Sequence, residues 1–401
     1  MEAFSQILGP IGGVATLASL PSAMELLLVT FGVTLPSRSR KGASVTAAKT
    51  SMAIIVPAHN EEAFIAYCVA SLQASAAVVG ECRVIVVADN CSDMTAERAR
   101  QAGARVLIRE NDVKRGKGFA LQFAFDTLMK EDFDSFLVLD ADSVVSVNLV
   151  SEVASAFARG SDAIQCRYRV LPPLATTRKR LMDIAFTAFN VLRPRGRSKW
   201  GLSAGIFGNG FALTRQTLME VPYSAHSIVE DLEYHLLLVE SGKKVHFCNR
   251  ATVYGDMPEE AGAQASQRAR WEGGRARVAL AWVPRLIPSL FRGNLLVAEP
   301  LLELLTLPLA YLSTLALLLC ALPIPAFRYI GVFLIALLFA HVTISILMTG
   351  EVGQSMRALI TSPAYVVWKL TRLGSIMRAS RPDAEWLRTP REGEVKDSSH
   401  V

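Results

Sequence analysis

Charged residues are scarce in this chain. They make up 19% of its 401 residues, whereas hydrophobic residues make up 51%; an ordinary soluble domain has about 25% charged residues. This shortage argues against a fully soluble protein and favours a membrane protein. The formal net charge of +6 does not indicate nucleic acid binding, because many Lys and Arg residues cluster beside apolar segments. Basic residues commonly flank membrane spans on the cytoplasmic side.

Closely spaced cysteines and glycine-rich phosphate loops are also missing. The six cysteines are scattered without Cys-x-x-Cys spacing, so neither a zinc site nor a disulfide framework is indicated, and reduced thiols are expected. The glycines around Lys117 are too few and wrongly spaced for a Walker A loop, which argues against ATP hydrolysis. The Gly-rich start of a sugar nucleotidyltransferase is absent after the first expected strand. His59 has no second histidine nearby, so we interpret it as a loop residue rather than a metal ligand.

A membrane-length apolar stretch lies near the start of the chain. Residues 12–35 contain Glu25 as their only charge and are long enough to cross a bilayer. The first residues include no Lys or Arg, so we favour a retained transmembrane helix at 1–36 over a cleaved signal peptide. A basic linker at 37–50 follows, and the positive-inside rule then places the next domain in the cytosol.

Apolar and amphipathic segments return after residue 274. We expect an amphipathic interface helix at 275–293, kinked or broken by Pro284 and Pro288, with a helix packed on a soluble domain as the alternative. Two transmembrane helices are expected within 294–350. Glu299 and Glu303 lie near the start of the first apolar segment, which suggests that the later part of this segment crosses the membrane. A second interface helix at 351–380 and a polar tail at 381–401 complete the chain, with the N-terminus outside and the C-terminus inside.

The segment 51–274 alternates short β-branched runs with helical stretches. Strands are expected at 52–57, 83–87, 104–107 and 135–139, and helices at 61–74, 95–102 and 118–129. This alternation predicts an α/β fold with a mostly parallel sheet covered on both faces. Ligands of such sheets collect at the carboxyl ends of the strands.

Polar clusters occupy three of these strand ends: His59-Asn60-Glu61-Glu62, Asp89-Asn90-Cys91-Ser92-Asp93 and Asp140-Ala141-Asp142. The last cluster delivers two carboxylates to one edge. Carboxylate oxygens suit Mg²⁺ or Mn²⁺, usually with phosphate oxygens completing the coordination. A solvated turn is the ordinary alternative for an isolated Asp-x-Asp, but three clusters at three strand ends predict a nucleotide site.

Three further motifs follow in order: the glycine-containing loop Ala204–Phe211, the acidic pair after Val229, and Gln267-x-x-Arg270-Trp271. A carboxylate at a helix start, as at Glu230 or Asp231, suits a general base, although an acidic helix N-terminus stabilised by its dipole is the simpler alternative. Arg270 can pair with a diphosphate through two hydrogen bonds. Trp271 offers a flat face to a sugar ring, unless it is only a membrane-interface residue.

This ordered set of motifs, bracketed by apolar segments, resembles the membrane-embedded inverting glycosyltransferases of family 2. That group includes cellulose, chitin and hyaluronan synthases and ceramide glucosyltransferases. The resemblance covers about Ser51 to Leu280. It implies a nucleotide-sugar-binding domain of the GT-A type, a divalent Mg or Mn ion and a nucleotide-sugar donor, which we expect to be a UDP-sugar. Transmembrane and interfacial helices would accompany this domain.

The resemblance also implies roles for single residues. Asp231 aligns with the family's base, although Val229 replaces the usual Thr, and Glu230 is the first alternative. Asp142 is the candidate direct ligand of the metal ion. Asp140 is assigned either to the ribose of the nucleoside or to the immediate surroundings of the metal. The remaining donor-binding candidates are Pro57, His59, Glu61, Asp89, Lys117, Gln267 and Arg270. The acceptor-binding candidates are Gly208, Asn209, Gly210 and Trp271.

The resulting hypothesis is a hexosyltransferase of the bacterial inner membrane that adds one sugar to a lipid-linked or saccharide acceptor. Exopolysaccharide or glycolipid synthesis would be its setting, with membrane lipids and no nucleic acid among its partners. A processive polysaccharide synthase that forms its channel as a homo-oligomer is one alternative. A non-catalytic nucleotide-sugar-binding membrane subunit is another.

Overall fold

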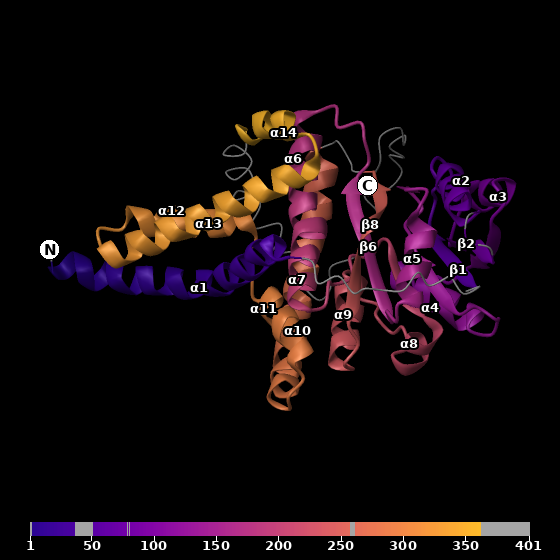
Figure 1. The fold of residues 1–401 in the computed structure, drawn as a ribbon, viewed down its shortest axis with the longest axis horizontal. Helices are drawn as coiled ribbons and strands as arrows, with labels where there is room; N and C mark the ends of the chain where they lie inside the picture. Colours follow the sequence, from indigo (N-terminus) through magenta and orange to yellow (C-terminus); the bar gives the residue numbers. More distant parts are fainter. Residues whose placement is uncertain (1, 37–50, 78, 80, 257–260, 362–401) are drawn as a thin grey trace.

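The structure, a computed structural model, describes residues 2–36, 51–77, 79, 81–256 and 261–361, with the backbone alone at 2–7 and 261–270. The expected linker 37–50, the tail 381–401 and most of the expected interface helix 351–380 lie outside these residues. An arm of apolar helices projects from a mixed α/β domain, and upright helices stand between the two parts (Figure 1).

Four parallel strands build the first half of the sheet. They are β1 (Met52–Ala58), β2 (Cys82–Asp89), β3 (Arg105–Arg109) and β4 (Ser135–Val138), in the order β3-β2-β1-β4. Helices α2 (Ile65–Ala76), α3 (Thr95–Gln101) and α4 (Lys117–Leu128) connect them. Side chains alternate across a strand, so Ile54 packs in the core beneath α2 and Ile55 in the core beneath α4. The strands and helices expected from the sequence here are confirmed to within a few residues.

The second half of the sheet is mixed. It contains β5 (Ser143–Val145), β6 (Ala163–Val170), β7 (Phe211–Thr214) and β8 (Val245–Gly255), and the order continues β4-β7-β6-β8-β5. Strand β7 runs antiparallel to β4 and β6, whereas β6 and β8 are parallel and β5 is antiparallel to β8. Helices α5 (Leu149–Ala158), α8 (Arg215–Glu220) and α9 (Glu230–Glu240) belong to this half.

A helical strut joins the α/β domain to the arm. It comprises α6 (Thr177–Thr187), the π-helical turn η1 (Ala188–Leu192) and α7 (Arg193–Trp200), and α7 packs on α1 (Glu2–Thr34). A Cβ atom added to Gly196 would lie 2.2 Å from the carbonyl oxygen of Val29, so the two backbones almost touch. Small residues permit such close crossings of helices.

Helix α10 (Ala261–Phe291) continues through Pro284 and Pro288, so the helix is not broken there. It also runs through the expected domain boundary at 274/275. Val278, Trp282 and Leu286 are buried in a core shared with α9. The opposite face exposes Leu280, Ile287 and Phe291. One face of the helix therefore packs on the α/β domain, and the other is apolar and exposed. The sequence offered an interface helix and a helix packed on a soluble domain as alternatives, and α10 has features of both.

The first apolar segment within 294–350 is divided into two parts. The turn η2 (Leu295–Val297) and α11 (Ala298–Leu304) precede α12 (Leu309–Ala321), and the two parts meet at 72°. Pro308 lies at the break, where proline removes a backbone donor and disfavours helix in the preceding residue. Helices α13 (Pro325–Thr349) and α14 (Val352–Leu359) follow.

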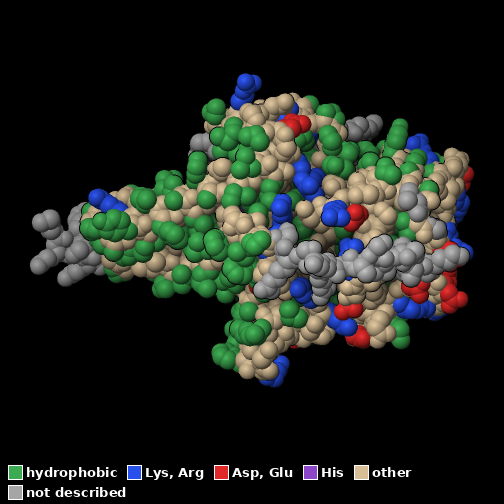
Figure 2. Space-filling model, viewed as in Figure 1, with side chains coloured by type: hydrophobic (Ala, Val, Ile, Leu, Met, Phe, Trp, Pro, Cys, Tyr) green, Lys and Arg blue, Asp and Glu red, His purple; other side chains and the backbone are tan. Residues whose placement is uncertain are grey.

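Within the described residues, Leu8–Thr34 and Pro325–Thr349 are long and apolar enough to cross a membrane, and the bent pair makes a third span if it counts as one. Helices α1, α12 and α13 share a core that includes Leu26, Leu312 and Leu334. Their outer surfaces are covered by hydrophobic side chains, and Lys and Arg side chains gather where the arm meets the domain (Figure 2).

Candidate active site

The loops after β1 and β2 interlock at the carboxyl edge of the sheet. Asn60 and Asn90 adopt the left-handed conformation (φ 53° and 50°), which asparagine tolerates better than most residues. Oδ1 of Asn60 accepts a hydrogen bond from the backbone N–H of Ser92 at 2.8 Å, and Oγ1 of Thr95 accepts one from the N–H of Glu61 at 2.7 Å. Four expected donor-binding residues lie on this edge: Pro57, His59, Glu61 and Asp89.

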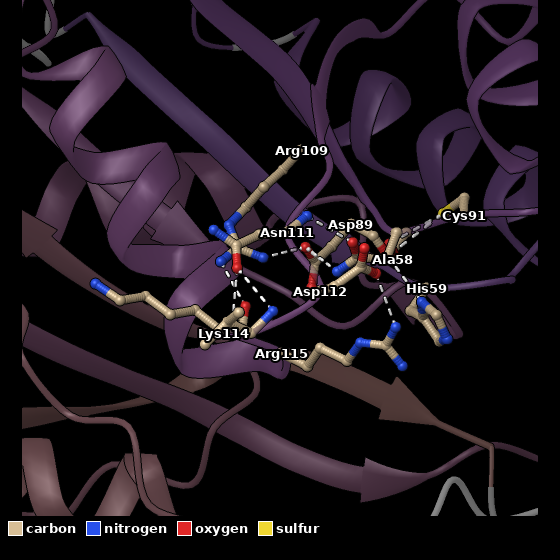
Figure 3. Close-up of polar contacts among 11 residues, drawn as sticks. Ala58, His59, Asp89, Cys91, Arg109, Asn111, Asp112, Lys114 and Arg115 are labelled. Carbon is tan, nitrogen blue, oxygen red and sulfur yellow. Dashed lines mark hydrogen bonds and ion pairs between the residues drawn. The ribbon is translucent and has the colours of Figure 1, made fainter.

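Asp89 is held by an arginine that sequence reasoning missed. Nη1 of Arg109 lies 2.5 Å from Oδ1 of Asp89, and both side chains are 8% exposed. Nη2 of Arg109 donates to the carbonyl oxygen of Lys114 at 2.6 Å, which ties the following loop to the same point (Figure 3). Nδ1 of His59 lies 2.7 Å from the carbonyl oxygen of Asp89. The expected third strand ended at Leu107, whereas in the structure β3 pairs Arg109 with Asp89 across the sheet.

The ammonium group of Lys117 lies between the Asp-x-Asp motif and the acidic pair Glu230–Asp231. Its Nζ lies 2.5 Å from Oδ1 of Asp140 and 3.8 Å from Oε1 of Glu230. Nζ also donates to the carbonyl oxygen of Gly208 at 2.7 Å. Although burial acts against it, the carboxylates of Asp140 and Glu230 raise the pKa of Lys117 above its usual value. Residues from α4, from the end of β4 and from α9 therefore meet around one ammonium group.

The backbone of the glycine-containing loop 204–210 lies beside Lys117 and Asp231. Gly208 has a φ of +74°, and a Cβ atom there would lie 3.3 Å from Oδ2 of Asp231. Gly210, with a φ of +72°, would bring a Cβ atom to 2.7 Å from Cγ2 of Val253. Glycine is therefore required at both positions, by conformation and by space.

Asn209 was expected to contact the acceptor, but its side chain lies inside the protein. Its side chain is fully buried. Oδ1 accepts the backbone N–H of Asp140 at 3.1 Å, and Nδ2 donates to Oγ of Ser143 at 2.8 Å. Both ends of the amide are thus used inside the protein, and Asn209 orients the Asp-x-Asp loop.

The buried thiol of Cys68 lies beside the Asp-x-Asp motif and donates to the carbonyl oxygen of Asp140 at 3.5 Å. Burial raises the pKa of Cys68, and the charges of Asp142, Asp140 and Glu61 raise it further, which places all three carboxylates near this sulfur. Among the described residues no group of three His, Cys, Asp or Glu side chains has the arrangement of a complete metal site. The oxygen donors of Asp140 and Asp142 fit Mg²⁺ or Mn²⁺ bound through one or two carboxylates, with phosphate oxygens as the remaining ligands.

Glu230 and Asp231 begin α9, as the sequence predicts. Burial raises the pKa of Glu230 to about 7, although the nearby ammonium of Lys117 lowers it. Burial also raises the pKa of Asp231, opposed by the backbone N–H of Leu232, which donates to Oδ1 at 2.8 Å, and by Lys117. Two carboxylates with raised pKa values beside a cation form a site suited to accepting a proton near neutral pH.

Trp271 belongs to an aromatic row that the sequence did not predict. Its ring centroid lies 6.4 Å from that of Phe186 in α6, and Phe186 lies 5.5 Å from Tyr168 in β6. Trp271 is 40% exposed, so part of its surface remains accessible. Gln267 and Arg270 are in α10, but their side chains lie outside the described residues.

Residues 49–274 match the family described as glycosyltransferase like family 2. YdaM of Bacillus subtilis (strain 168), named a probable glycosyltransferase, is 25% identical over 238 residues, which cover 57% of this chain and 56% of YdaM. The chain therefore matches little more than half the length of that curated relative.

Two solved structures are similar. The mannosyltransferase PcManGT from Pyrobaculum calidifontis, in complex with GDP-Man and Mn²⁺, has a TM-score of 0.53 and 16% identity over 92% of this chain and 99% of its own. Glucosyl-3-phosphoglycerate synthase from Mycobacterium tuberculosis, with Mn²⁺, UDP-glucose and glycerol 3-phosphate, has a TM-score of 0.37 and 21% identity over 57% of this chain and 82% of its own. The first likeness shows the fold, a mixed GT-A-type sheet with apolar helices. Because the matched family segment spans more than half of the chain and contains the acidic centre described above, this chain belongs to the glycosyltransferase-like family 2.

Proposed function

We propose that this chain is a membrane-bound inverting hexosyltransferase that moves a sugar from a UDP-sugar to a lipid-linked or saccharide acceptor. Its setting would be exopolysaccharide or glycolipid synthesis. One observation carries the proposal. Lys117 joins Asp140 to Glu230, while Asp231 lies against Gly208 in the neighbouring loop. The motif suited to a metal-bound diphosphate thus lies beside the motif suited to a base.

The donor would lie along the carboxyl edge of the sheet. Oδ1 of Asp89 is occupied by Arg109, and Oδ2 makes no hydrogen bond with the described residues, so it is available to an N–H of the base. Glu61 follows β1, which lies between β2, ending at Asp89, and β4, preceding the Asp-x-Asp motif, and this position suits the ribose. Asp142 and Asp140 would hold Mg²⁺ or Mn²⁺, which as a Lewis acid offsets the charge that develops on the departing diphosphate. Arg270 and Gln267 are assigned to the same diphosphate by family resemblance.

The chemical step needs a base and an in-line acceptor. An acceptor hydroxyl oxygen forms the bond to the anomeric carbon while the bond from that carbon to the diphosphate oxygen breaks. The hydroxyl proton passes to the carboxylate of Asp231, and the bonding electrons leave with the nucleoside diphosphate. Attack opposite the leaving group inverts the anomeric configuration. The raised pKa of Asp231 makes its carboxylate a better proton acceptor at neutral pH.

The acceptor would approach from the side of the aromatic row. Trp271 presents an accessible indole face to a sugar ring. Gly208, where a Cβ atom would lie 3.3 Å from Oδ2 of Asp231, and Gly210 are assigned to the acceptor side by family resemblance. An acceptor carried on a lipid is consistent with the position of the exposed face of α10 beside the apolar arm (Figures 1 and 2).

The proposed location is the bacterial inner membrane, with the α/β domain in the cytosol. If the bent pair α11–α12 counts as one span, the N-terminus lies outside and the C-terminus inside. A C-terminal alkaline phosphatase fusion, which works only when exported, should therefore be inactive, and a C-terminal fluorescent protein should be bright. An active phosphatase fusion would contradict this topology.

The function is tested by screening nucleotide sugars with the purified full-length protein and Mn²⁺ or Mg²⁺. Hydrolysis of one UDP-sugar is expected, with transfer once membrane lipid extract is added and with Asp231→Asn as the inactive control. Products of a single added sugar support the proposal, whereas long polymers from an oligomer indicate a processive synthase. Binding of a UDP-sugar without any turnover would instead indicate a non-catalytic subunit.

A further inference from the structure

A group of charged side chains is buried where the apolar arm meets the α/β domain. Arg197 of α7 is at its centre. Its Nη2 lies 2.7 Å from Oε1 of Glu25 and 3.1 Å from Oε2 of Glu303, and its Nε lies 2.5 Å from Oε1 of Glu299. The side chain of Arg197 is 1% exposed and that of Glu25 is fully buried. One guanidinium therefore contacts carboxylates from α1 and from α11.

Glu25 is the only charged residue in the candidate span Leu8–Thr34. An ionisable residue within a span is costly and marks a functional or pairing role. Buried ion pairs add little net stability compared with apolar packing, but removal of one partner leaves the other charge uncompensated. The pairing of Glu25 with Arg197 thus makes the position of α7 depend on the docking of α1.

Arg197 also contacts the first residues of the glycine-containing loop 204–210. Its Nη1 donates to the carbonyl oxygen of Ala204 at 3.5 Å. A Cβ atom added to Gly205 would lie 3.6 Å from the same Nη1. Four residues past Ala204, the loop reaches the candidate active site, where Gly208 lies against Asp231. The guanidinium therefore lies beneath one end of the loop, and the candidate base lies beside the other.

A second arginine of α7 reaches the same loop. Arg193, one helical turn before Arg197, lies over the ring of Phe189 with its guanidinium carbon 5.1 Å from the centroid. The ring centroid of Phe189 lies 5.7 Å from that of Phe207 in the loop. Nη1 of Arg193 is 3.9 Å from Oε1 of Glu303. Both arginines thus connect the buried carboxylates to the loop, one through backbone and one through aromatic side chains.

We propose that Glu25 and Arg197 are positioning residues through which the membrane helix α1 holds the loop 204–210 against Asp231. The proposal rests on the proposed function, because it takes this loop as the acceptor side of the site. Without the carboxylate of Glu25, Arg197 is drawn toward α11, and the hydrogen bond beneath Ala204 weakens. Asp89, which is assigned to the nucleoside base, lies away from this loop, whereas Gly208 lies against Asp231, so the loss falls on the chemical step more than on donor binding.

The test is Glu25→Gln in the full-length, membrane-inserted protein. The kcat of transfer should fall by about 10-fold to 100-fold, as expected for a small displacement of reacting groups. The KM for the donor should change by less than the kcat of transfer, because Asp89 at the nucleoside end of the site makes no contact with this loop. Amide hydrogen exchange should increase in residues 203–211. Glu25→Asp, which keeps the charge on a shorter side chain, should recover part of the rate and part of the protection.

Glu351→Gln is the matched control. It removes a 2.5 Å ion pair with Arg180, which also links the strut to the segment after α13. Unlike the Glu25–Arg197 pair, this pair is partly exposed to solvent, and it is distant in sequence from the loop 204–210. It should leave the kcat of transfer and the exchange of 203–211 unchanged. If Glu25→Gln does not accumulate, Arg197→Lys replaces it, because it keeps the charge but loses the fork that reaches Ala204.

Two results would overturn the inference. One is a Glu25→Gln protein with wild-type kcat and wild-type exchange in 203–211. The other is exchange that increases throughout the α/β domain together with a raised donor KM, which indicates a merely structural role. Failure of the proposed function is separate from both. In that case the wild-type protein transfers no sugar, yet the exchange of 203–211 still reports whether Glu25 supports the loop.

Discussion

Nζ of Lys117 lies 2.5 Å from Oδ1 of Asp140, although Lys117 begins α4 and Asp140 follows β4. The same ammonium is 3.8 Å from Glu230, so a single cation is shared between the Asp-x-Asp motif and the acidic pair of α9. The protonation of the candidate base is thereby linked to the charge of the motif assigned to the diphosphate.

Replacing Lys117 with Met should move the pH dependence of transfer to higher pH. The base must be deprotonated to act, so the rate falls as pH drops through the pKa of the Glu230–Asp231 pair, near 7 for Glu230. Lys117 lowers the pKa of both carboxylates, and its removal should raise the midpoint of the kcat profile by about one unit. Lys117→Arg should keep the wild-type midpoint. An identical profile for Lys117→Met would show that the pair is not coupled to this ammonium.

The same pair also affects stability. The pKa of Glu230 is raised in the folded protein from 4.5 to about 7, so its protonated form stabilises the fold below pH 4.5. That contribution, about 3 kcal/mol at most, is lost as pH rises through 7. Glu230→Gln should remove this slope from a plot of Tm against pH.

Asp142→Ala should abolish transfer and the response to Mn²⁺ or Mg²⁺, because a direct oxygen ligand of the metal is lost. Isothermal titration of Mn²⁺ in the presence of UDP measures the binding loss directly. Asp126→Ala, which removes an exposed carboxylate from α4, is the control and should behave as wild type. Wild-type turnover that survives in excess chelator would refute the metal assignment.

Asp231→Asn should leave binding of donor and metal nearly intact while turnover falls. The amide retains the shape and can accept the N–H of Leu232, but it cannot take up a proton. A general base contributes about 10²–10⁴-fold in rate, and the loss should appear in kcat rather than in the donor KM. If donor binding is lost while the rate at saturating donor is kept, the base is another residue, with Glu230 the first to test.

Trp271→Ala should weaken use of the acceptor while slow donor hydrolysis persists. The indole is 40% exposed and packs beside Phe186, so its removal opens the acceptor side without disturbing Asp231. Kinetics with varied acceptor should show a raised KM for the acceptor. Phe291→Ala, at an 86% exposed position of the same helix, controls for loss of an aromatic residue. Equal effects of both variants would point to membrane association rather than acceptor contact.

Gly196→Ala should destabilise the junction between the strut and α1. The added methyl group would lie 2.2 Å from the carbonyl oxygen of Val29, so the helices must separate, at a cost of about 1–3 kcal/mol. Thermal unfolding in detergent measures the loss. Gly13→Ala in α1, where no atom lies within 4 Å of the new carbon, should be neutral. Equal stability of the two variants would show that the close crossing does not form.

Local patterns in the sequence were sufficient for the elements that carry the donor edge. β-Branched runs at 52–57 and 135–139 predict buried strands, and the strands β1 and β4 occupy almost these residues. Polar residues directly after them predict a shared edge, because carboxyl ends of parallel strands lie together. The helix start at Glu230 was likewise predictable from its acidic first turn. Each of these inferences depends on neighbours within a few residues along the chain.

The partners of the charges were decided by tertiary structure alone. Glu25 and Arg197 are 172 residues apart, and the contact of Lys117 with Gly208 spans 91 residues. The apolar segment 295–321 bends by 72° after Leu304, and the part before the bend carries Glu299 and Glu303, which pair with Arg197. Periodicity and composition report which face of an element is buried, but they do not report which element covers it. The sequence thus determined where the carboxylates and arginines stand along the chain, whereas packing determined which of them meet, because a buried charge takes the counter-charge that the fold brings within reach.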